Sequence, residues 1–501
     1  MSATGSDHVA DGMQRSAPGA NPTAAEGGTS AGGGFALATD HTGTGAKVAG
    51  EVGGLRLSAG AAEQLSRCVH CGFCLPACPT YRELGEEADS PRGRIDMVGA
   101  AYRGEVALAD PDLALHMERC LDCRACESAC PSGVQYHLLF EAAMGALPPV
   151  GAGGMADGKG AWDPTLQTGA TSRGLRVALR HLVRQPRLLA WMAARPGRWP
   201  ALARRLPPAV AALAAGLPAG GKGPARYRLP RLLAARGPRR GTVDLFLGCV
   251  QDACFGDDNL AMAGVLQAWG YDVHLVPTQT CCGALQSHTG DAAAVRQLGQ
   301  RNVRAFAGER PVVVAAAGCS ALLREYGRLF GDTGFADGAR SLAMRVRDFS
   351  AFLAEVPGAQ RPVPLPPSGA PVRVTYHDPC HLSHAQGVRR QPRELLAALP
   401  GVRYVELPEA DACCGSAGVY NLTQPELAGR VLARKVDHIR ATGAEWVVTA
   451  NPGCVLQLRA GLRAAQLNVR VLSLAEVLGA AYGQGTGHIA VGAEADVPSG
   501  W

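Results

Sequence analysis

Two cysteine runs of identical spacing constrain this sequence more than any other feature. Residues 68–79 read CVHCGFCLPACP and residues 120–131 read CLDCRACESACP, so both follow C-x2-C-x2-C-x3-C-P. Three thiolates within seven residues can bind one face of an iron–sulfur cube, while the fourth, directed away and followed by proline, serves another cube. We therefore expect two [4Fe-4S] clusters, one on Cys68, Cys71, Cys74 and Cys130 and the other on Cys120, Cys123, Cys126 and Cys78.

Zinc and ordinary core cysteines are the rival interpretations of these eight residues. Tetrahedral zinc usually takes two C-x2–4-C pairs instead of two runs of four, and scattered core cysteines would not share one register. The 41 residues between the motifs exceed what a minimal ferredoxin needs. Ser90-Pro91 suits the start of a helix, and a second helix is expected over 110–120, so we predict a helical ferredoxin domain. Arg92 and Arg94 either offset the negative charge of the clusters or are ordinary residues of the helix start.

Residues 242–484 contain two copies of a second pattern. VDLFLGC opens the first copy and VRVTYHDPC the second, and both are strand-like runs that end in cysteine. A helical stretch, a short strand, a Cys-Cys-Gly triplet, another helix and a third strand-like run ending in cysteine follow each opening. This order predicts small parallel sheets flanked by helices, with every repeated cysteine at the sheet edge where α/β proteins bind ligands. The fold class is therefore α+β multidomain, a helical ferredoxin-type domain followed by two repeated α/β cysteine-rich domains.

Each copy gathers four cysteines, and a seventeenth, Cys254, has no counterpart and is read as structural. The two sets are Cys249, Cys281, Cys282 and Cys319, and Cys380, Cys413, Cys414 and Cys454. Adjacent cysteines cannot comfortably chelate one ion, but they can reach different irons of a larger cluster, and Gly283 and Gly415 would permit a tight turn. His377, His381 and His384 surround Cys380, either as ligands or hydrogen-bond donors to a cluster or as ordinary polar residues.

Length and composition divide the rest of the chain. With 501 residues and 47% hydrophobic content, the chain should form several domains instead of a disordered whole. The expected divisions are a Gly/Ala-rich disordered extension (1–54), the ferredoxin domain (55–148), a basic helical linker (149–241), the first cysteine-rich domain (242–335), a connector (336–371), the second cysteine-rich domain (372–484) and a tail (485–501). No signal peptide or membrane span is expected, and the abundance of free cysteine favours a reducing cytoplasm.

The linker is strongly basic. Residues 165–240 carry 16 Lys and Arg and no Asp or Glu, so the remainder carries 6 − 16 = −10 of the formal charge. A docking face for a partner or for the inner, anionic membrane surface and a solvated helical linker are equally good interpretations. Nucleic-acid binding is a weaker one, because no recognised motif accompanies the charge.

The Cys-Cys-Gly pattern resembles the cysteine-rich domains of heterodisulfide reductase and its relatives. In that family each motif ends in C-x2-C and carries a non-cubane iron–sulfur cluster, whereas here Leu322 and Gln457 replace the final cysteine. An ordinary cluster, a shared site between domains and a redox-active thiol site therefore all stay open.

The whole arrangement resembles the iron–sulfur subunits of hydroxyacid oxidases, glycolate oxidase among them. The residues that carry the resemblance are CVHCGFCLPACPTY, DSPRGRI, CLDCRACESACPSGVQYH, CCGSAGVYNLTQPELAGRVLARK and TANPGC. It implies partner subunits that hold FAD and oxidise glycolate to glyoxylate, while this chain passes electrons to a quinone or another acceptor and does not itself oxidise substrate. The absence of a GxGxxG after a strand agrees with that division.

Three alternatives to this assignment are compatible with the sequence. One is the equivalent subunit of a lactate or glycerol-3-phosphate dehydrogenase. Another is a disulfide reductase acting at the Cys-Cys-Gly site, against which the missing fifth cysteines count. The third is a structural zinc protein without a redox role.

Overall fold

A computed structural model of the chain describes residues 54–148, 177, 179–181, 185–193, 217, 223–355, 361–365 and 370–482. All of them belong to one compact unit. The expected extension up to residue 53, most of the basic linker and the tail lie outside these residues, and so do the interpretations placed on them.

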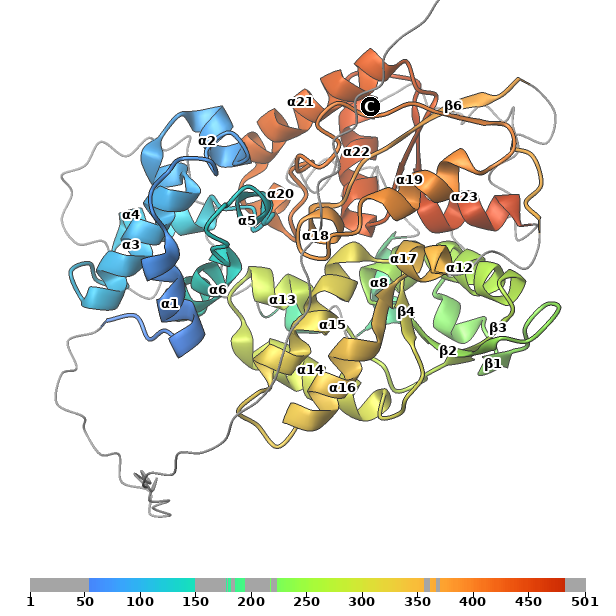
Figure 1. Cartoon of the computed structure of the whole chain (residues 1–501), viewed down its shortest axis with the longest axis horizontal. Coiled ribbons are helices and arrows are strands. Elements are labelled where there is room, and N and C mark those ends of the chain that lie inside the picture. Colours follow the sequence, from blue (N-terminus) through green and yellow to red (C-terminus); the bar gives the residue numbers. More distant parts are fainter. Residues whose placement is uncertain are drawn as a thin grey trace, which may run out of the picture. The chain divides into compact units, whose positions relative to one another are not determined.

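The ferredoxin-type region is helical, as predicted (Figure 1). Its elements are α1 (Ala59–Arg67), α2 (Pro79–Leu84), η1 (Glu87–Asp89), α3 (Pro91–Arg103), α4 (Pro111–Glu118), α5 (Ala125–Ser128) and α6 (Tyr136–Ala146). The hydroxyl of Ser90 accepts a hydrogen bond from the backbone N–H of Gly93 at 3.0 Å, which confirms the predicted N-cap of α3. Buried residues of α3, α4 and α6, including Val98, Met117 and Leu139, form the core of this region.

The first repeat builds a five-stranded sheet in the order β1-β3-β2-β4-β5. Its strands are β1 (Leu232–Leu233), β2 (Gly241–Phe246), β3 (Tyr271–Leu275), β4 (Val312–Val314) and β5 (Val346–Asp348). Only β1 runs antiparallel to its neighbour within this sheet. Its helices are α11 (Val250–Cys254), α12 (Gly256–Ala268), α13 (Ala284–His288), α14 (Ala292–Ala305), α15 (Ala317–Leu329), α16 (Ala336–Arg345) and α17 (Phe349–Ala354), preceded by α8 (Pro186–Ala193) and η4 (Ala225–Tyr227).

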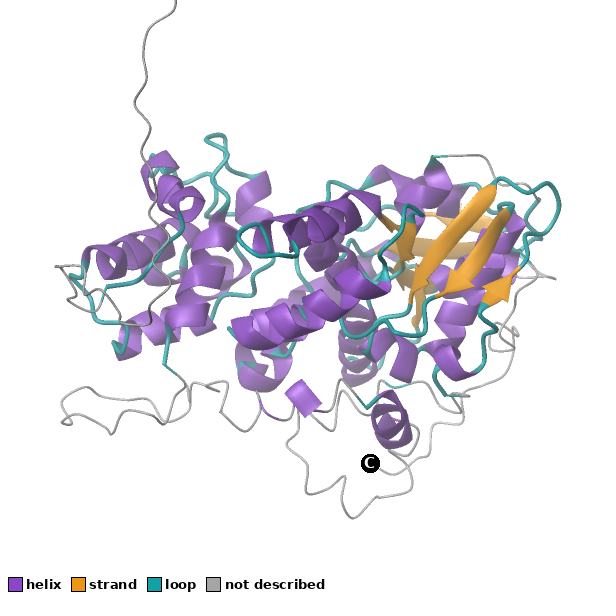
Figure 2. Ribbon diagram, turned by 90° about the horizontal axis from the view of Figure 1, so that it is seen from below, coloured by secondary structure: helices purple, strands orange, loops and turns teal. Residues whose placement is uncertain are grey.

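The second repeat builds a four-stranded, fully parallel sheet in the order β7-β6-β8-β9. Its strands are β6 (Val372–Tyr376), β7 (Val402–Tyr404), β8 (Trp446–Thr449) and β9 (Arg470–Ser473). Its helices are α18 (Cys380–Ser383), α19 (Arg390–Ala397), α20 (Tyr420–Thr423), α21 (Pro425–Thr442), α22 (Pro452–Ala464) and α23 (Leu474–Ala481). Figure 2 shows the strands covered by helices, which confirms the predicted α/β architecture.

Two details differ from the expectation. Each repeat has a further parallel strand, and β5 of the first sheet lies in the segment read as a connector. The third strands also stop before their cysteines, so that Cys319 and Cys454 lie in the first turns of α15 and α22. In the second repeat the reason is local, because Pro452 favours the first position of a helix and cannot donate to a sheet.

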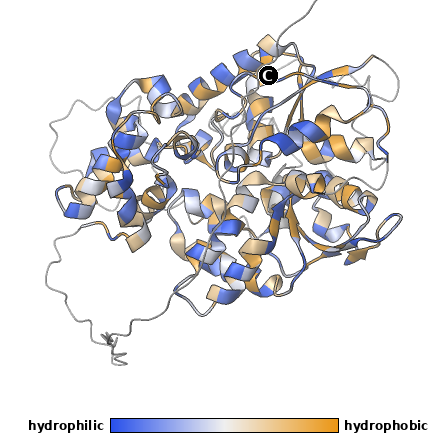
Figure 3. Ribbon diagram, viewed as in Figure 1, coloured by the Kyte–Doolittle hydropathy of each residue, from blue (hydrophilic) through white to orange (hydrophobic). Residues whose placement is uncertain are grey.

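The two sheets share one apolar core. Val243 and Val273 of the first repeat and Val374, Val448 and Leu478 of the second belong to a single cluster of buried side chains. Helices α12 and α23 pack closely there. A Cβ added to Gly479 of α23 would lie only 2.6 Å from the Cβ of Ala261 on α12, so this contact requires glycine. The helices show stripes of polar and apolar residues in Figure 3, as expected for helices that cover a core. The repeats therefore form one packed pair.

Candidate metal centres

The two ferredoxin motifs adopt the same backbone course. His70 and Asp122, each two residues after the first cysteine, have left-handed φ angles of 54° and 48°, and Gly72 and Arg124, two residues later, have φ angles of 83° and 60°. Alternation of this kind turns backbone N–H groups toward a common concavity. The N–H of Asp122 donates to the Sγ of Cys120 at 3.4 Å. Both loops are therefore shaped to surround a negatively charged group.

The fourth cysteine of the first motif lies near the second motif. Burial raises the pKa of the Cys123 and Cys126 thiols well above their usual value, and the charges of Cys78 and Cys120 add to the shift. Burial raises the pKa of Cys120 to about 11. Metal binding requires thiolates, so a metal would replace the protons that these buried sulfurs otherwise keep.

Arg94 places a buried cation beside the same sulfurs. Its side chain is 1% exposed, and its Nη2 lies 3.1 Å from the Oδ1 of the fully buried Asp89. Burial would lower the pKa of Arg94, but neighbouring groups, including Cys120 and Cys78, raise it above its usual value. Arg92 pairs with Glu87 near the surface, and its Nη1 donates to the carbonyl oxygen of His70 in the first motif at 3.0 Å. Arg94 is therefore a buried cation beside the second motif, and Arg92 a partly exposed one beside the first.

The four cysteines of the first repeat converge at one edge of its sheet. Cys249 follows β2, Cys281 and Cys282 precede α13, and Cys319 lies at the start of α15. The Sγ atoms of Cys281 and Cys249 are 3.3 Å apart, and those of Cys282 and Cys319 are 3.2 Å apart. Four soft ligands so close together suit an iron–sulfur centre.

The second repeat brings together the corresponding four cysteines. The contact with Cys413, together with burial, raises the pKa of Cys380 well above its usual value. Cys414 lies between Cys413, which lowers its pKa, and Cys454, which together with burial raises it well above the usual value. The buried ammonium of Lys435 donates to the carbonyl oxygens of Glu409 and Ala410, in the loop before Cys413. Burial lowers the pKa of Lys435, and the neighbouring thiols oppose that effect. A cation therefore accompanies this thiol set as well.

The positions of the missing fifth cysteines hold no replacement ligand. Leu322 is buried in the apolar core of the first repeat. Gln457 is buried too, and its amide oxygen accepts a hydrogen bond of 2.8 Å from the side chain of Asn421. Cys254 lies at the end of α11 and packs against an apolar cluster.

The three histidines around Cys380 have separate environments. The ring nitrogens of His384 lie 2.9 Å from the hydroxyl of Ser128 and 3.0 Å from the carbonyl oxygen of Asp411. His377 is fully buried, in one group with Cys414 and Cys454 whose ligand atoms lie within 4.8 Å of one another.

His381 forms a similar group with two residues that the sequence analysis did not single out, Asp122 and His288. No sequence spacing could have revealed this group, because its members come from the ferredoxin motif and both repeats. Burial raises the pKa of Asp122 to about 7 and lowers that of His288 to about 4.

The second ferredoxin motif packs directly on the second repeat. Cys123 and Cys413 belong to one buried cluster with Tyr420 and Leu427. The hydroxyl of Tyr420 donates to the carbonyl oxygen of Arg119 at 2.9 Å. A paired contact between Arg82 and Glu409, with both N–O distances at 2.8 Å, lies at the same boundary. Cysteines of the two regions are therefore neighbours across a packed interface.

Comparison with known proteins agrees with this organisation. Residues 64–134 match the model of the 4Fe-4S dicluster domain, and residues 243–324 and 374–459 both match the model of the cysteine-rich CCG domain. Fold and sites thus define an iron–sulfur protein of the electron-transfer class, associated with an oxidoreductase. Within the described residues, no helix combines the length and apolar character that crossing a bilayer requires.

Relatives that match over most of their length identify the family within this class of electron-transfer proteins. The chain is 35% identical over 444 residues to the probable glycolate oxidase iron–sulfur subunit of Bacillus subtilis (strain 168), covering 84% of this chain and 95% of that protein. It is 32% identical to the glycolate oxidase iron–sulfur subunit of Escherichia coli (strain K12), covering 79% and 89%. Lactate utilization protein A of Oceanobacillus iheyensis is 31% identical over 47% of this chain and 96% of that protein. The chain belongs to the family of glycolate oxidase iron–sulfur subunits.

Proposed function

We propose that this chain is the electron-transfer subunit of a complex that oxidises glycolate to glyoxylate. The observation that carries the proposal is the packing of Cys123 against the buried cluster that contains Cys413, because it joins the dicluster region to the second repeat. Similarity to two glycolate oxidase iron–sulfur subunits over most of their length supports the choice of substrate. FAD belongs to partner subunits, and the final acceptor is a quinone or another oxidant.

The ligand sets that we propose follow the spacing and the contacts of the cysteines. One [4Fe-4S] cluster takes Cys68, Cys71, Cys74 and Cys130, and the other takes Cys120, Cys123, Cys126 and Cys78. The charge of Cys78 contributes to the raised pKa of Cys123 and Cys126, so Cys78 lies near the second motif. This supports a fourth ligand that each motif supplies to the cluster of the other. Further centres occupy the thiol sets of the two repeats, as the short sulfur–sulfur distances in the first repeat suggest.

In this proposal the clusters supply one-electron transfer. Cys78 and Cys123 of the second ligand set are buried, whereas Cys71 of the first is exposed. Buried Arg94 and Lys435 offset negative charge beside the thiolates. The protein works in the cytoplasm, with the membrane's inner face as a docking surface where the acceptor is a quinone.

Substrate-driven reduction tests the proposal. The chain is co-purified anaerobically with its flavin-containing partners, and cluster reduction is followed by EPR after glycolate is added. We expect reduction with glycolate in the complex and none in the isolated chain. Failure of glycolate to reduce any cluster in a complex that dithionite reduces fully would overturn the proposal.

Lactate oxidation is the second candidate, because lactate utilization protein A is similar to about half of this chain. The same experiment with L-lactate and glycerol 3-phosphate discriminates the substrates. Reduction by lactate but not glycolate would assign the chain to a lactate-oxidising complex.

A further inference from the structure

The ring of the buried His377 has no partner at hydrogen-bond geometry. Its side chain is 0% exposed, and neither Nδ1 nor Nε2 meets that geometry, although the backbone carbonyl of Ala410 lies near the ring. A neutral imidazole offers one N–H donor and one lone pair, and leaving both unused in the interior costs free energy. Such a residue needs an explanation, and a role as a metal ligand supplies one.

One of the two ring nitrogens lies close to two cysteines. A ring nitrogen of His377 and the Sγ atoms of Cys414 and Cys454 all lie within 4.8 Å of one another. Ligands that share one tetrahedral ion at bond lengths of about 2.1–2.3 Å lie roughly 3.5–4 Å apart. Small side-chain movements therefore bring this nitrogen and these sulfurs onto one metal atom.

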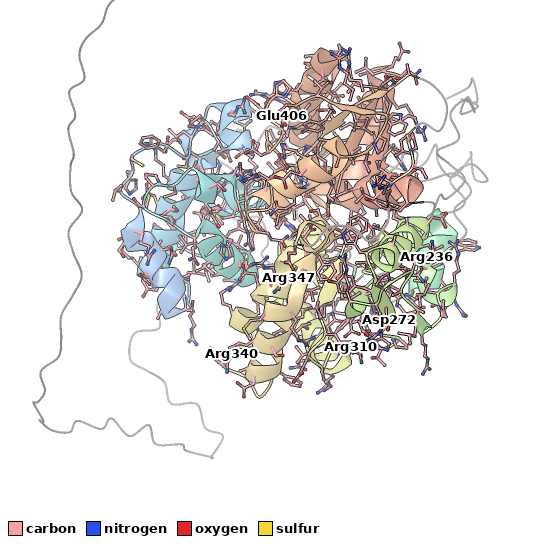
Figure 4. The ribbon with its side chains drawn as sticks, turned by 45° about the vertical axis from the view of Figure 1, so that its right-hand side comes forward. Arg236, Asp272, Arg310, Arg340, Arg347 and Glu406 are labelled. Atoms are coloured by element: carbon pink, nitrogen blue, oxygen red, sulfur yellow. The ribbon has the colours of Figure 1, made fainter. Side chains whose placement is uncertain are left out.

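The backbone around His377 is held firmly. Its N–H donates to the carbonyl oxygen of Val448 on β8 at 2.9 Å. The next residue, Asp378, forms a two-point ion pair with Arg393 at 2.7 and 2.8 Å. Arg393 also binds Glu406, a residue labelled in Figure 4. These contacts fix the backbone that carries the ring of His377.

The first repeat lacks an equivalent imidazole. Three residues before Cys249, where the second repeat has His377 before Cys380, stands Phe246. Phe246 is buried in the same apolar cluster as Cys282. The two thiol sets therefore match, but only the second has a nitrogen donor beside it.

We propose that His377 is a nitrogen ligand of the iron–sulfur centre in the second repeat, so that the two repeats hold centres of different ligation. The inference rests on the proposed function in one respect, that the second repeat holds such a centre. Replacement of thiolate ligands by imidazole raises the reduction potential of an iron–sulfur centre. The centre of the second repeat is then the more easily reduced of the two.

Pulsed EPR on the full chain tests this assignment. The chain is purified anaerobically with ¹⁵N-labelled histidine and reduced with dithionite. We expect a strong ¹⁵N coupling from iron-bound imidazole in the unaltered chain, a measurement that requires no variant. The His377→Cys variant supplies a thiolate instead, so we expect the coupling to disappear while the iron and sulfide content stays the same. The reduction potential of the second-repeat centre should fall.

His384→Gln is the matched control. It removes a histidine from the same segment whose ring nitrogens have other partners, so the coupling should persist. Full iron content without the ¹⁵N coupling, or a coupling that survives His377→Cys, would overturn the assignment. About eight irons per chain, enough for the two cubanes only, would overturn it too, while glycolate-driven reduction of those cubanes would leave the proposed function standing.

Discussion

At the scale of single residues, the chain buries charge where it gathers sulfur. Asp89 is fully buried and binds Arg94, Arg119 and His116 at 3.1, 2.9 and 3.0 Å. Burial alone would raise the pKa of Asp89, but the hydrogen bond from His116 and the charges of the two arginines bring it below its usual value. This network joins η1, α3 and α4 behind Cys78 and Cys120.

Arg94→Met tests the importance of this network. The substitution removes the cation from a buried ion pair, so we expect a loss of roughly 3–5 kcal/mol in the free energy of unfolding. A lower potential of the neighbouring cluster should accompany it, because negative charge is then less well offset. Arg103→Met, at the exposed pair with Glu105, should change neither the free energy of unfolding measured in urea nor the reduction potential noticeably. Equal effects of the two variants would contradict this account.

Asp258 gives stability a defined pH dependence. Burial, followed by the charge of Glu476, raises the pKa of Asp258 to about 7, against 3.8 for an ordinary aspartate. The folded chain therefore holds this proton from about pH 4 to pH 7, and the contribution of Asp258 to stability falls as the pH rises through that window. Asp258→Asn removes the cost of ionisation, so its stability relative to the unaltered chain should rise with pH by roughly 2–4 kcal/mol. Denaturation curves at pH 5 and pH 8 check this, and a constant difference would contradict it.

At the scale of elements, the Cys-Cys-Gly turns define each repeat. Gly283 and Gly415 have left-handed φ angles of 97° and 86°. A Cβ on Gly283 would meet only ordinary contacts beyond 3.4 Å, whereas a Cβ on Gly415 would lie 2.6 Å from the carbonyl oxygen of Ala428. The same triplet therefore sits in an open turn in one repeat and against α21 in the other.

This difference predicts unequal effects of one substitution. Gly283→Ala should cost about 1 kcal/mol from backbone strain alone. Gly415→Ala should cost clearly more and lower the iron content of the second repeat, because the backbone must move away from α21. Thermal melting and iron analysis of both variants provide the measurement. A larger loss for Gly283→Ala would show that the turns differ in another way.

Local signals made much of the element structure predictable. Ser90-Pro91 marks the start of α3, and the separation of polar and apolar faces marks α19. α12 has no such pattern, because it is buried on most sides. The turn into helix before Cys319 and Cys454 was missed, because a run of small and β-branched residues is compatible with either state. The approach of His377 to Cys454 and the meeting of Asp122, His288 and His381 depend on tertiary packing, which spacing alone does not report.

At the scale of the whole molecule, the interface that contains Cys123 and Cys413 links the dicluster region to the second repeat. Leu427 on α21 fills this interface and is 7% exposed. A substitution of Leu427 therefore changes this interface and leaves the separate cores of the two regions in place.

Leu427→Ala should loosen this junction without removing a ligand. A buried Leu→Ala change costs roughly 2–5 kcal/mol, and here the cavity would lie between two sulfur sites. We expect slower glycolate-driven reduction of the second-repeat centre with unchanged iron content. Leu342→Ala, in the core of the first repeat, is the control for destabilisation alone. Equal reduction rates in both variants would argue against electron transfer through this interface.

The central claim is that iron–sulfur centres occupy both the ferredoxin motifs and the cysteine-rich repeats. Iron and acid-labile sulfide per chain, measured on anaerobically purified protein, test it most directly. The account predicts about twelve irons or more, since two cubanes alone need about eight. About eight irons per chain, which would leave the repeats without centres, or little iron with full zinc occupancy would contradict it.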